Sequence, residues 1–468
     1  PRQVVDDAHL PRLEFIDLSV AADPGAAARE AMQRDRGTPV DPARDRLAVQ
    51  HLYRLGADRF VWYFRVHHLA TDGYGMALFA DRVCALYGAS GDADAGAPLA
   101  ALPPVFEEDA AYRVSERRGK DAAFWREAMA GMPAATGLGG GFAAAAHDCH
   151  RHVVALDEGL RAALVATAQR VGQPWPDVLT AFTAEYCRRM SGQQEAVVGV
   201  PFMGRLGSAS ARVPAMVMNV LPLRVPAMPD AGVAAFVQAI ARALVRGRRH
   251  GRYRGEQLRR DLGLLGGQRR LHGPLVNVQP FYRAPRLGAL RVSLEILGTG
   301  PIDDVTIGFR GDATHALDLE IEANPALYDA DDVAAHATRL LAFLAAACSA
   351  EHMDDVPLAT PDEARRYLFE VNATAHVVPD TTLSALIEHT MQATPDALAV
   401  EFEGASLTYG ELERRTRALA RQLQALGAAA DAVVAVALPR SLELIVALVA
   451  TLRAGAAYLP LDLAHPDA

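Results

Sequence analysis

The chain has 468 residues, with 47 Lys and Arg against 56 Asp and Glu, which gives a formal net charge of −9. Its composition of 51% hydrophobic and 22% charged residues is typical of folded globular proteins and excludes a wholly disordered chain. Nucleic-acid-binding proteins usually carry a basic surplus, so the acidic balance argues against that class, and at roughly 150 residues per domain the length predicts about three globular units.

The first clear structural signal is a strand followed by a helix. Apolar residues alternate over Arg59–His68, which predicts a β-strand with His67 and His68 on opposite faces. A glycine-rich loop follows, and apolar residues spaced three or four apart then predict an amphipathic helix over Met76–Tyr87. The Gly/Ala-rich stretch Gly131–Ala146 predicts a boundary between two lobes.

Strands and helices alternate again after His152. The predicted helices are Ala162–Ser191, interrupted near Pro174 and Pro176, then Val233–Arg249 and Asp331–Ala347; the predicted strands are Glu195–Pro201, Asn219–Val225, Leu275–Val278 and a hairpin of Asp304–Phe309 with Ala316–Ala323. Two successive mixed blocks predict two α/β lobes. Polar, irregular sequence then indicates a linker, and helices over Thr382–Gln392 and Tyr409–Gly427 begin a third unit. We therefore divide the chain into a first lobe (1–145), a second lobe (146–350), a linker (351–380) and a third unit (381–468).

Cysteine and lysine usage excludes several kinds of chemistry. The cysteines are Cys84, Cys149, Cys187 and Cys348. They form no C-x-x-C pair, so the sequence predicts reduced thiols without a disulfide framework or a zinc site. The single lysine, Lys120, is followed by Asp121, whereas a phosphate-binding P-loop needs Gly-Lys-Ser/Thr. P-loop nucleotide chemistry from this segment is therefore excluded.

The ends of the chain suggest a part of a longer protein. It begins at Pro1 with no charged-then-apolar leader, so we expect a fragment or a processed product. The longest apolar run, Leu340–Cys348, is far shorter than the ~20 residues of a membrane-spanning helix. We therefore expect a soluble, cytoplasmic protein with no membrane contact.

Residues 67–73, H-H-L-A-T-D-G, are the best candidate for chemistry. Adjacent strand residues point to opposite faces, so His67 and His68 do not converge on one metal ion, and we predict no metal site. His68 leaves the aromatic face of the strand just before a loop, where an imidazole can meet a substrate. Asp72 precedes the next helix and Gly73 begins it. Taken singly, these residues also fit a core histidine and an ordinary N-cap, but the combination is far more specific.

This motif resembles the active-site motif of the condensation domains of nonribosomal peptide synthetases, which are relatives of chloramphenicol acetyltransferase. Further blocks resemble the same family in the same order. They are residues 199–205 (G-V-P-F-M-G-R), 218–224 (M-N-V-L-P-L-R), and two blocks similar to siderophore-type members, 252–258 (R-Y-R-G-E-Q-L) and 273–277 (G-P-L-V-N). The resemblance implies a two-lobed α/β fold like that of chloramphenicol acetyltransferase, with its first lobe truncated at the N-terminus.

The third unit resembles the start of an adenylation domain of the ANL type. Residues 407–412 (L-T-Y-G-E-L) and 452–462 (L-R-A-G-A-A-Y-L-P-L-D) are similar to the first two core motifs of that family. The sequence stops before the phosphate loop, the acidic motifs and the catalytic lysine that the family uses. We therefore expect no adenylation by this chain.

The resemblance implies a reaction and roles for individual residues. A donor acyl or peptidyl thioester and an aminoacyl thioester, both tethered by phosphopantetheine on carrier domains, would join through an amide bond. His68 would orient or deprotonate the amine, for which an imidazole with an ordinary pKa of about 6.5 is suited. The backbone N–H of Gly73 would stabilise the oxyanion. Asp72 would hold the loop with Arg205 as its partner, and His67 would serve packing. No cofactor is expected on this chain itself.

Carrier binding is a second prediction. Arginines concentrate between Arg242 and Arg260, and Arg248 and Arg249 are candidates for attracting an acidic carrier domain or a pantetheine phosphate. A solvated helix face with intrachain ion pairs is the alternative. Asn219 is a further candidate for substrate or carrier binding. The expected partners are upstream and downstream peptidyl or aryl carrier domains and the remainder of the synthetase, without nucleic acid.

Other functions share parts of this pattern. An epimerising or ester-forming member of the condensation family would carry the same histidine motif, and a catalytically inactive scaffold would bind carriers without reaction. A heterocyclisation domain would have paired aspartates instead, and a free acetyltransferase would lack the third unit. The resemblance to siderophore-type blocks favours an aryl or acyl donor.

Overall fold

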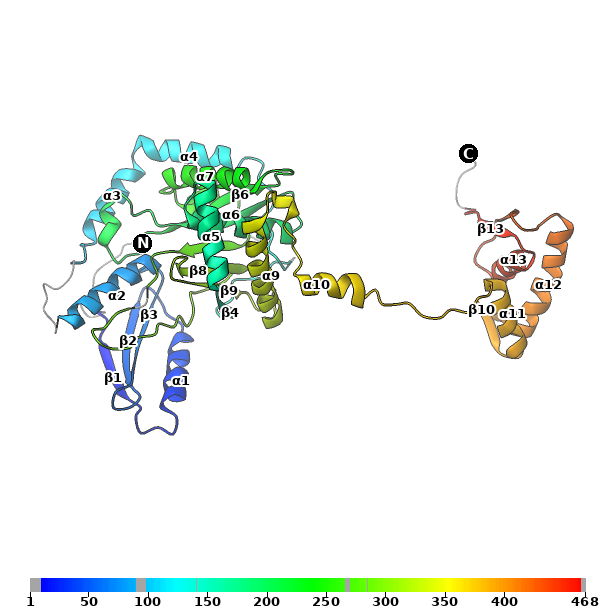
Figure 1. Cartoon of the computed structure of the whole chain (residues 1–468), viewed down its shortest axis with the longest axis horizontal. Coiled ribbons are helices and arrows are strands. Elements are labelled where there is room, and N and C mark those ends of the chain that lie inside the picture. The colour runs from blue at the N-terminus through cyan, green and yellow to red at the C-terminus, as the bar shows by residue number, and fades with distance from the viewer. Residues whose placement is uncertain (1–9, 90–97, 140, 266–269, 284, 464–468) are drawn as a thin grey trace. The chain divides into compact units, whose positions relative to one another are not determined.

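A computed structural model describes residues 10–89, 98–139, 141–265, 270–283 and 285–463. The chain forms two compact units, one up to Arg366 and one from Tyr367 onward (Figure 1). The division falls inside the stretch 351–380 that the sequence predicts as a linker. Each unit is described separately below. No helix in these described ranges is long and apolar enough to cross a membrane.

The first lobe is a three-stranded sheet with a helix on each face. Its elements are β1 (Leu13–Asp17), α1 (Pro24–Arg36), β2 (Ala48–Arg54), β3 (Phe60–Val66) and α2 (Gly73–Gly88). β1 is parallel to β2, and β2 is antiparallel to β3. Apolar residues of α1 join Tyr53 and Tyr63 in a small core on one face. On the other face, Phe79 of α2 stacks on Phe64 with 5.1 Å between ring centroids. β3 ends at Val66 and α2 begins at Gly73, so His67 and His68, which the alternation places on the strand, lie in the turn between the two elements.

The second lobe is a six-stranded mixed sheet in the order β4-β9-β8-β7-β5-β6. The strands are β4 (His150–Ala155), β5 (Glu195–Phe202), β6 (Asn219–Pro226), β7 (Leu275–Gln279), β8 (Val305–Asp312) and β9 (Ala316–Ala323). β7 is parallel to both β5 and β8, and the other pairs are antiparallel. Side chains of a strand alternate between faces. Ile307 and Phe309 therefore enter the core, whereas Arg310 and its cross-strand neighbours lie on the opposite, polar face.

Helices cover the apolar face of this sheet (Figure 1). They are α5 (Glu158–Val171), α6 (Trp175–Met190), α7 (Val233–Arg249) and α9 (Ala330–Ser349). α6 is the central helix, since every residue from Asp177 to Cys187 is buried. The large rings of Phe182, Phe309 and Phe343 meet in one continuous core. This core fixes the position of α7 and of the strands that carry the polar face.

Helices α3 (Pro103–Arg113) and α4 (Glu116–Ala128) pack on the second lobe, although the sequence division at residue 145 places them with the first. Trp125 of α4 is 2% exposed and belongs to the core of the second lobe. Its Nε1 donates to the carbonyl of His250 at 2.9 Å. The ring of Phe124 stacks on the His250 ring, with 4.0 Å between centroids. The short helices α8 (Gly255–Asp261) and α10 (Pro361–Arg365) complete the α-helices of this unit among the described residues.

The loop between β7 and β8 returns to the first lobe. Leu297 packs against the small core of that lobe, and the guanidinium of Arg36 donates to the Leu297 carbonyl. Arg36 also forms an ion pair with Asp148 at 2.9 Å. The two lobes are therefore joined at the end of α1 as well as beside α2.

The second unit is a small α/β arrangement. Its elements are α11 (Leu383–Ala393), β10 (Leu398–Phe402), β11 (Ala405–Thr408), α12 (Tyr409–Ala425), β12 (Val433–Val436), α13 (Leu442–Arg453) and β13 (Ala457–Pro460). The L-T-Y-G-E-L motif spans the end of β11 and the start of α12. Thr408 and Glu411 form a reciprocal capping box there, which satisfies two free N–H groups of the helix start.

Tight packing at Gly273 gives a test of how the segment after α4 is held on the second lobe. A β-carbon on Gly273 would lie 2.1 Å from the backbone oxygen of Thr136. Gly273→Ala should therefore destabilise the first unit by roughly 1–3 kcal/mol, the usual cost of overpacking. All three tryptophans, Trp62, Trp125 and Trp175, lie in this unit, so the fluorescence midpoint in urea reports its unfolding alone.

Gly119→Ala is the matched control. Gly119 is the fourth residue of α4, and no atom lies within 4 Å of the position of an added β-carbon. Because alanine is the better helix former by about 1 kcal/mol, this variant should be neutral or more stable. An equal response of the two variants would contradict the packing argument.

Candidate active site

The H-H-L-A-T-D-G segment forms a tight turn between β3 and α2. The N–H of His67 donates to the Leu47 carbonyl at 2.7 Å, which continues the sheet for one residue. Nδ1 of His67 accepts from the N–H of Leu69 at 3.1 Å and thereby holds the turn. His67 is half-buried. A packing role for His67 stays a prediction.

His68 occupies the corner of the turn and is exposed. Among the residues that the structure describes, none forms a hydrogen bond with its imidazole. The ring is thus available to a substrate while its backbone is fixed by the neighbouring turn. A free imidazole in this place can accept a proton or a hydrogen bond from an amine.

Asp72 lies at the opposite end of the turn and is 2% exposed. It is the N-cap of α2, and its Oδ1 accepts from the N–H of Gly75 at 2.8 Å. Oδ2 accepts from the N–H groups of Val217 and Met218, both at 3.0 Å. The carboxylate therefore joins the first lobe to the segment that precedes β6 in the second lobe.

Arg205 is the ionic partner of Asp72. Its Nη2 donates to both carboxylate oxygens, at 2.7 and 2.8 Å, and the guanidinium is 4% exposed. Backbone carbonyls accept further hydrogen bonds at 2.7 Å: Nη1 donates to those of Ser210 and Val213, and Nη2 to that of Ala215, whereas Nε is buried without a partner among the described residues. The guanidinium also lies 5.2 Å from the centroid of the Tyr74 ring. The pairing that the sequence predicts is present, and it organises residues 205–218 around one charge.

The two glycines of this helix start face the second lobe. A β-carbon on Gly75 would lie 2.3 Å from Oγ1 of Thr71 and 3.2 Å from the backbone nitrogen of Ala215, so only glycine fits. At Gly73 a β-carbon would lie 3.5 Å from Nε2 of Gln279. The first turn of α2 is therefore in contact with the end of β7.

Sequence reasoning missed Gln279. The only signal was the alternation in β7, in which Val276 and Val278 share one face and Asn277 and Gln279 share the other. The carboxamide of Gln279 accepts from Nε of Arg310 at 3.0 Å. Burial raises the pKa of the Glu322 carboxyl on the same polar face. This face therefore carries charged groups that the apolar pattern of the strands concealed.

Asn219 is engaged by the protein's own backbone. Its Nδ2 donates to the carbonyls of Gly251 and Tyr253, at 2.9 and 2.7 Å. Its Oδ1 accepts from the N–H of Gly255 at 3.1 Å. All the donors of this side chain are used to fix the turn before α8, and substrate or carrier binding by Asn219 stays a prediction.

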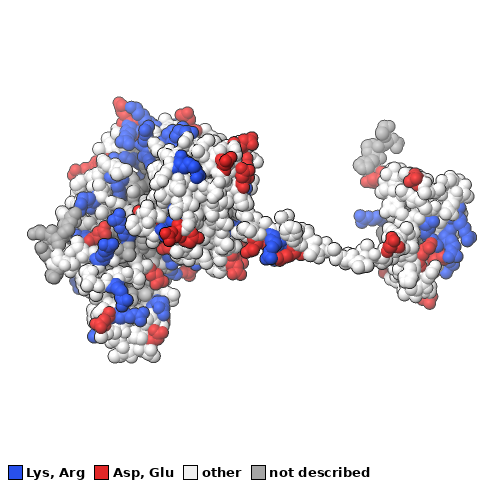
Figure 2. All heavy atoms as spheres, viewed as in Figure 1, with Lys and Arg blue, Asp and Glu red and all other residues white. Residues whose placement is uncertain are grey.

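The arginines of α7 divide into paired and exposed residues. Arg248 forms a two-pronged ion pair with Asp177. Arg249 is exposed, and its backbone carbonyl accepts from Arg117. Figure 2 shows Lys and Arg side chains gathered over α4 and α7. The positive charge that the sequence predicts for this helix is therefore present at the surface, although Arg248 forms an ion pair with Asp177.

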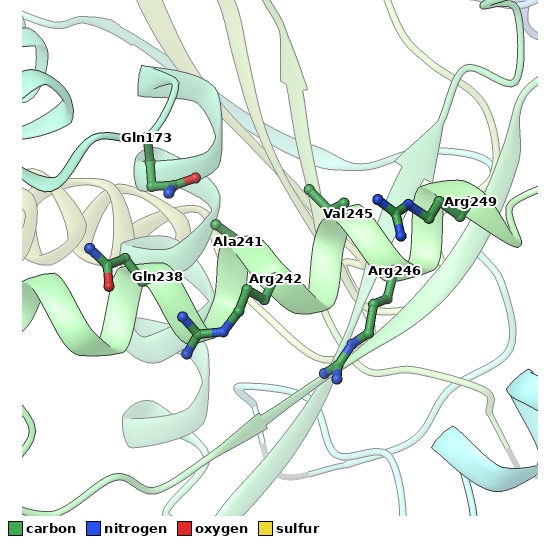
Figure 3. A pocket seen from close by; sticks show the side chains of 7 residues that line it. All are labelled: Gln173, Gln238, Ala241, Arg242, Val245, Arg246 and Arg249. Carbon is green, nitrogen blue, oxygen red and sulfur yellow. The ribbon is translucent and has the colours of Figure 1, made fainter.

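A depression with about 550 Å³ of accessible space lies beside α7 (Figure 3). Its lining residues are Gln173, Gln238, Ala241, Arg242, Val245, Arg246 and Arg249. Three guanidinium groups from consecutive turns of the helix border it, together with two carboxamides. Such a surface suits an anionic group.

Among the described residues, no group of three or more His, Cys, Asp or Glu side chains is arranged to hold a metal ion. The four cysteines are free thiols, and Cys187 and Cys348 are buried.

The two units of the chain match two different protein families. The profile of the condensation domain matches residues 1–366, which is the whole first unit. The chain belongs to the condensation-domain family. The profile of AMP-binding enzymes matches residues 387–468, in the second unit. The condensation domain is thus followed by the beginning of an adenylation domain.

Two curated relatives and one solved structure define the resemblance. A dimodular nonribosomal peptide synthase of Bacillus subtilis (strain 168) is 35% identical over 100% of this chain and 20% of its own length. Enterobactin synthase component F of Escherichia coli (strain K12) is 34% identical over 99% of this chain and 36% of its own length. The chain therefore spans well under half of either relative. The first condensation domain of the CDA synthetase has a TM-score of 0.67 and 33% identity, covering 75% of this chain and 78% of that chain.

The contribution of the Asp72–Arg205 pair to the stability of the condensation domain can be measured directly. Asp72→Asn should lower the free energy of unfolding by about 3 kcal/mol or more, because Arg205 is left charged and buried without its counter-ion. The measurement is the urea midpoint of tryptophan fluorescence. Arg205→Gln in the same chain should recover part of the loss, which a double-mutant cycle will resolve.

Asp157→Asn serves as the matched control for this prediction. Asp157 caps α5 by accepting from the N–H of Leu160 at 2.7 Å, without an arginine partner among the described contacts. Asparagine is about as good an N-cap as aspartate, so this variant should change stability by roughly 0.5 kcal/mol or less. A similar cost at Asp72 would show that the ion pair contributes nothing beyond the cap.

Proposed function

We propose that this condensation domain is an acyltransferase that forms an amide bond between two carrier-bound substrates. The donor is an acyl or peptidyl thioester, and the acceptor is the amine of an aminoacyl thioester. The observation that carries the proposal is the exposed imidazole of His68, held at the end of β3 by a turn that Asp72 and Arg205 lock to the second lobe.

The chemistry requires little beyond position and proton handling. A thioester is already activated, so the amine lone pair attacks its carbonyl carbon and the carbonyl electrons move to oxygen. The oxyanion then collapses, the C–S bond breaks and the thiolate leaves. The amine proton passes to His68 and from there to the thiolate sulfur, which balances the step. Holding the two reacting atoms at ~3–3.5 Å supplies much of the acceleration.

The first turn of α2 is suited to the developing negative charge. Gly73 is the first residue of the helix, where N–H groups lack helical acceptors and the helix dipole is positive. Gly73 is also exposed, so its backbone can approach a substrate. Asp72 holds this turn in place and handles no proton, because its carboxylate is buried in a complete set of hydrogen bonds.

No cofactor of its own is part of this proposal. Phosphopantetheine enters as the tether of each substrate on its carrier domain. The upstream and downstream carriers, with the remainder of the synthetase, are the proposed partners. Support comes from the multidomain synthetases among the relatives, whose length far exceeds that of this chain.

Carrier attraction is assigned to the arginine depression on α7. Arg242, Arg246 and Arg249 border it, whereas Arg248 is bound to Asp177. An acidic carrier surface or a pantetheine phosphate would complement three guanidinium groups. Of the two arginines that the sequence suggests, Arg249 is kept in this proposal, and Arg242 and Arg246 take the place of Arg248.

His68→Ala is expected to reduce the single-turnover rate of amide formation by roughly 10²–10⁴-fold, the usual contribution of a general base. The assay uses the complete synthetase module with both carriers loaded; mass spectrometry detects the condensed product, alkaline hydrolysis separates ester from amide, and chiral chromatography of the released substrate detects epimerisation. His68→Gln retains a hydrogen-bond acceptor without a basic nitrogen. It should resemble His68→Ala if proton transfer matters, and the wild type if orientation suffices.

His315→Ala is the control, because His315 is exposed in the turn between β8 and β9. It should react at the wild-type rate. Full activity of His68→Ala would reject the proposal, and binding of loaded carriers without any product in the wild type would favour an inactive docking scaffold.

Reversal of charge tests the carrier surface. Arg246→Glu with Arg249→Glu should raise the apparent KM for the carrier substrate by at least tenfold and leave kcat within twofold, because the depression lies outside the reacting centre. The effect should shrink as salt is added. Arg414→Glu with Arg421→Glu, on the exposed face of α12, makes the same charge change in the second unit. An equal rise in KM for that control would mean that only net charge matters.

A further inference from the structure

The polar face of the six-stranded sheet reaches the start of α2 through one side chain. Gln279 is the last residue of β7, and its Nε2 lies 3.5 Å from the position that a β-carbon would take on Gly73. Because Gly73 has no side chain, nothing of that residue stands between the Gln279 amide and the first helical turn. The sheet of the second lobe therefore presents a group to the same place as the helix of the first lobe.

The orientation of the Gln279 carboxamide is fixed by its neighbour. Nε of Arg310 donates to Oε1 of Gln279 at 3.0 Å. A guanidinium has donors and no acceptor, so the oxygen must face Arg310 and the NH2 group must face away from it. The NH2 group is thus directed toward Gly73. The usual ambiguity between the two ends of a carboxamide does not arise here.

A buried chain of ion pairs holds Arg310. Its Nη1 lies 2.6 Å from Oε2 of Glu320, whose Oε1 lies 2.6 Å from Nε of Arg151. Glu320 is 4% exposed, so this carboxylate is fully engaged away from water. The guanidinium of Arg310 also lies 5.7 Å from the centroid of the Tyr282 ring. With its guanidinium anchored on both sides, Arg310 keeps the Gln279 amide in one position.

The NH2 group of Gln279 is an unused donor. Among the described residues none forms a hydrogen bond with its Nε2. The positive charge of Arg310 on the oxygen side polarises the carboxamide and strengthens its N–H groups as donors. A preorganised donor of this kind is most effective where negative charge develops during a reaction.

We propose that Gln279 is a catalytic residue that donates a hydrogen bond to the thioester oxygen as that oxygen becomes an oxyanion, together with the N–H of Gly73. The inference rests on the function proposed above, because it assigns a second donor to the same acyl transfer. Gln279 undergoes no covalent change. Its hydrogen bond strengthens when the amine attacks and weakens when the thiolate leaves.

Gln279→Met is the variant that tests this assignment. Methionine has a similar length and no donor, so the pocket stays filled while the hydrogen bond is lost. Loss of one oxyanion donor should lower kcat by roughly 10²–10³-fold, with KM for both loaded carriers within threefold. The assay is single turnover in the complete module, and the urea midpoint of tryptophan fluorescence confirms that the first unit is folded.

Two further variants keep the test decisive. Gln279→Glu retains the contact to Arg310 and removes both donors, so it should lose kcat as well even if the methionine variant folds poorly. Gln169→Met, on the exposed end of α5, makes the same substitution far from the site and should be fully active. His68→Ala is run beside them.

The outcomes separate the two proposals. Loss of kcat in His68→Ala and in both Gln279 variants supports the donor role. Loss in His68→Ala with both Gln279 variants within threefold of the wild type overturns it and leaves the proposed function intact. A tenfold rise in KM without loss of kcat also overturns it, since it would assign Gln279 to ground-state binding. Full activity of His68→Ala removes the proposed function itself.

Discussion

A carboxylate and a guanidinium that are both removed from water, Asp72 and Arg205, are the constraint on which the site depends. Taking two charges out of water costs several kcal/mol each, and the cost is offset only when nearly every lone pair and proton finds a partner. Here Asp72 receives the N–H groups of Gly75, Val217 and Met218, and Arg205 donates to three carbonyls. All these hydrogen bonds can therefore form only when α2 docks on the second lobe in one arrangement.

This constraint explains how an exposed imidazole can be accurately placed. His68 has no side-chain partner among the described residues, yet the turn that carries it is fixed at His67 by the sheet and at Asp72 by the ion pair. The same docking brings the first turn of α2 against the end of β7, where Gln279 meets Gly73. Gly73 of the first lobe and Gln279 of the second lobe therefore lie side by side, and a change in the Asp72–Arg205 geometry would separate them.

Local patterns predicted the parts of this arrangement that local chemistry determines. Alternation over Arg59–His68 gave β3, the spacing of apolar residues gave α7 at its observed bounds, and the motif placed Asp72 as an N-cap. Contacts between residues that are far apart in the sequence were harder to predict. Nothing local predicted that Trp125 of α4 fills the core of the second lobe, that Asp177 neutralises Arg248, or that Gly251 and Tyr253 engage Asn219. Gln279 was missed because its role appears only when Arg310 and Gly73 are brought together.

Hydrogen exchange in the intact chain with Arg205→Gln tests the central claim most directly. If the ion pair couples the lobes, the peptide that covers the first turn of α2 and the peptide that contains Val217 and Met218 should lose protection together and by similar free energies. A peptide from the β8–β9 hairpin should keep its wild-type protection. Loosening of residues 205–218 alone, with the first turn of α2 as protected as in the wild type, would show that the lobes dock without the pair and would contradict this account.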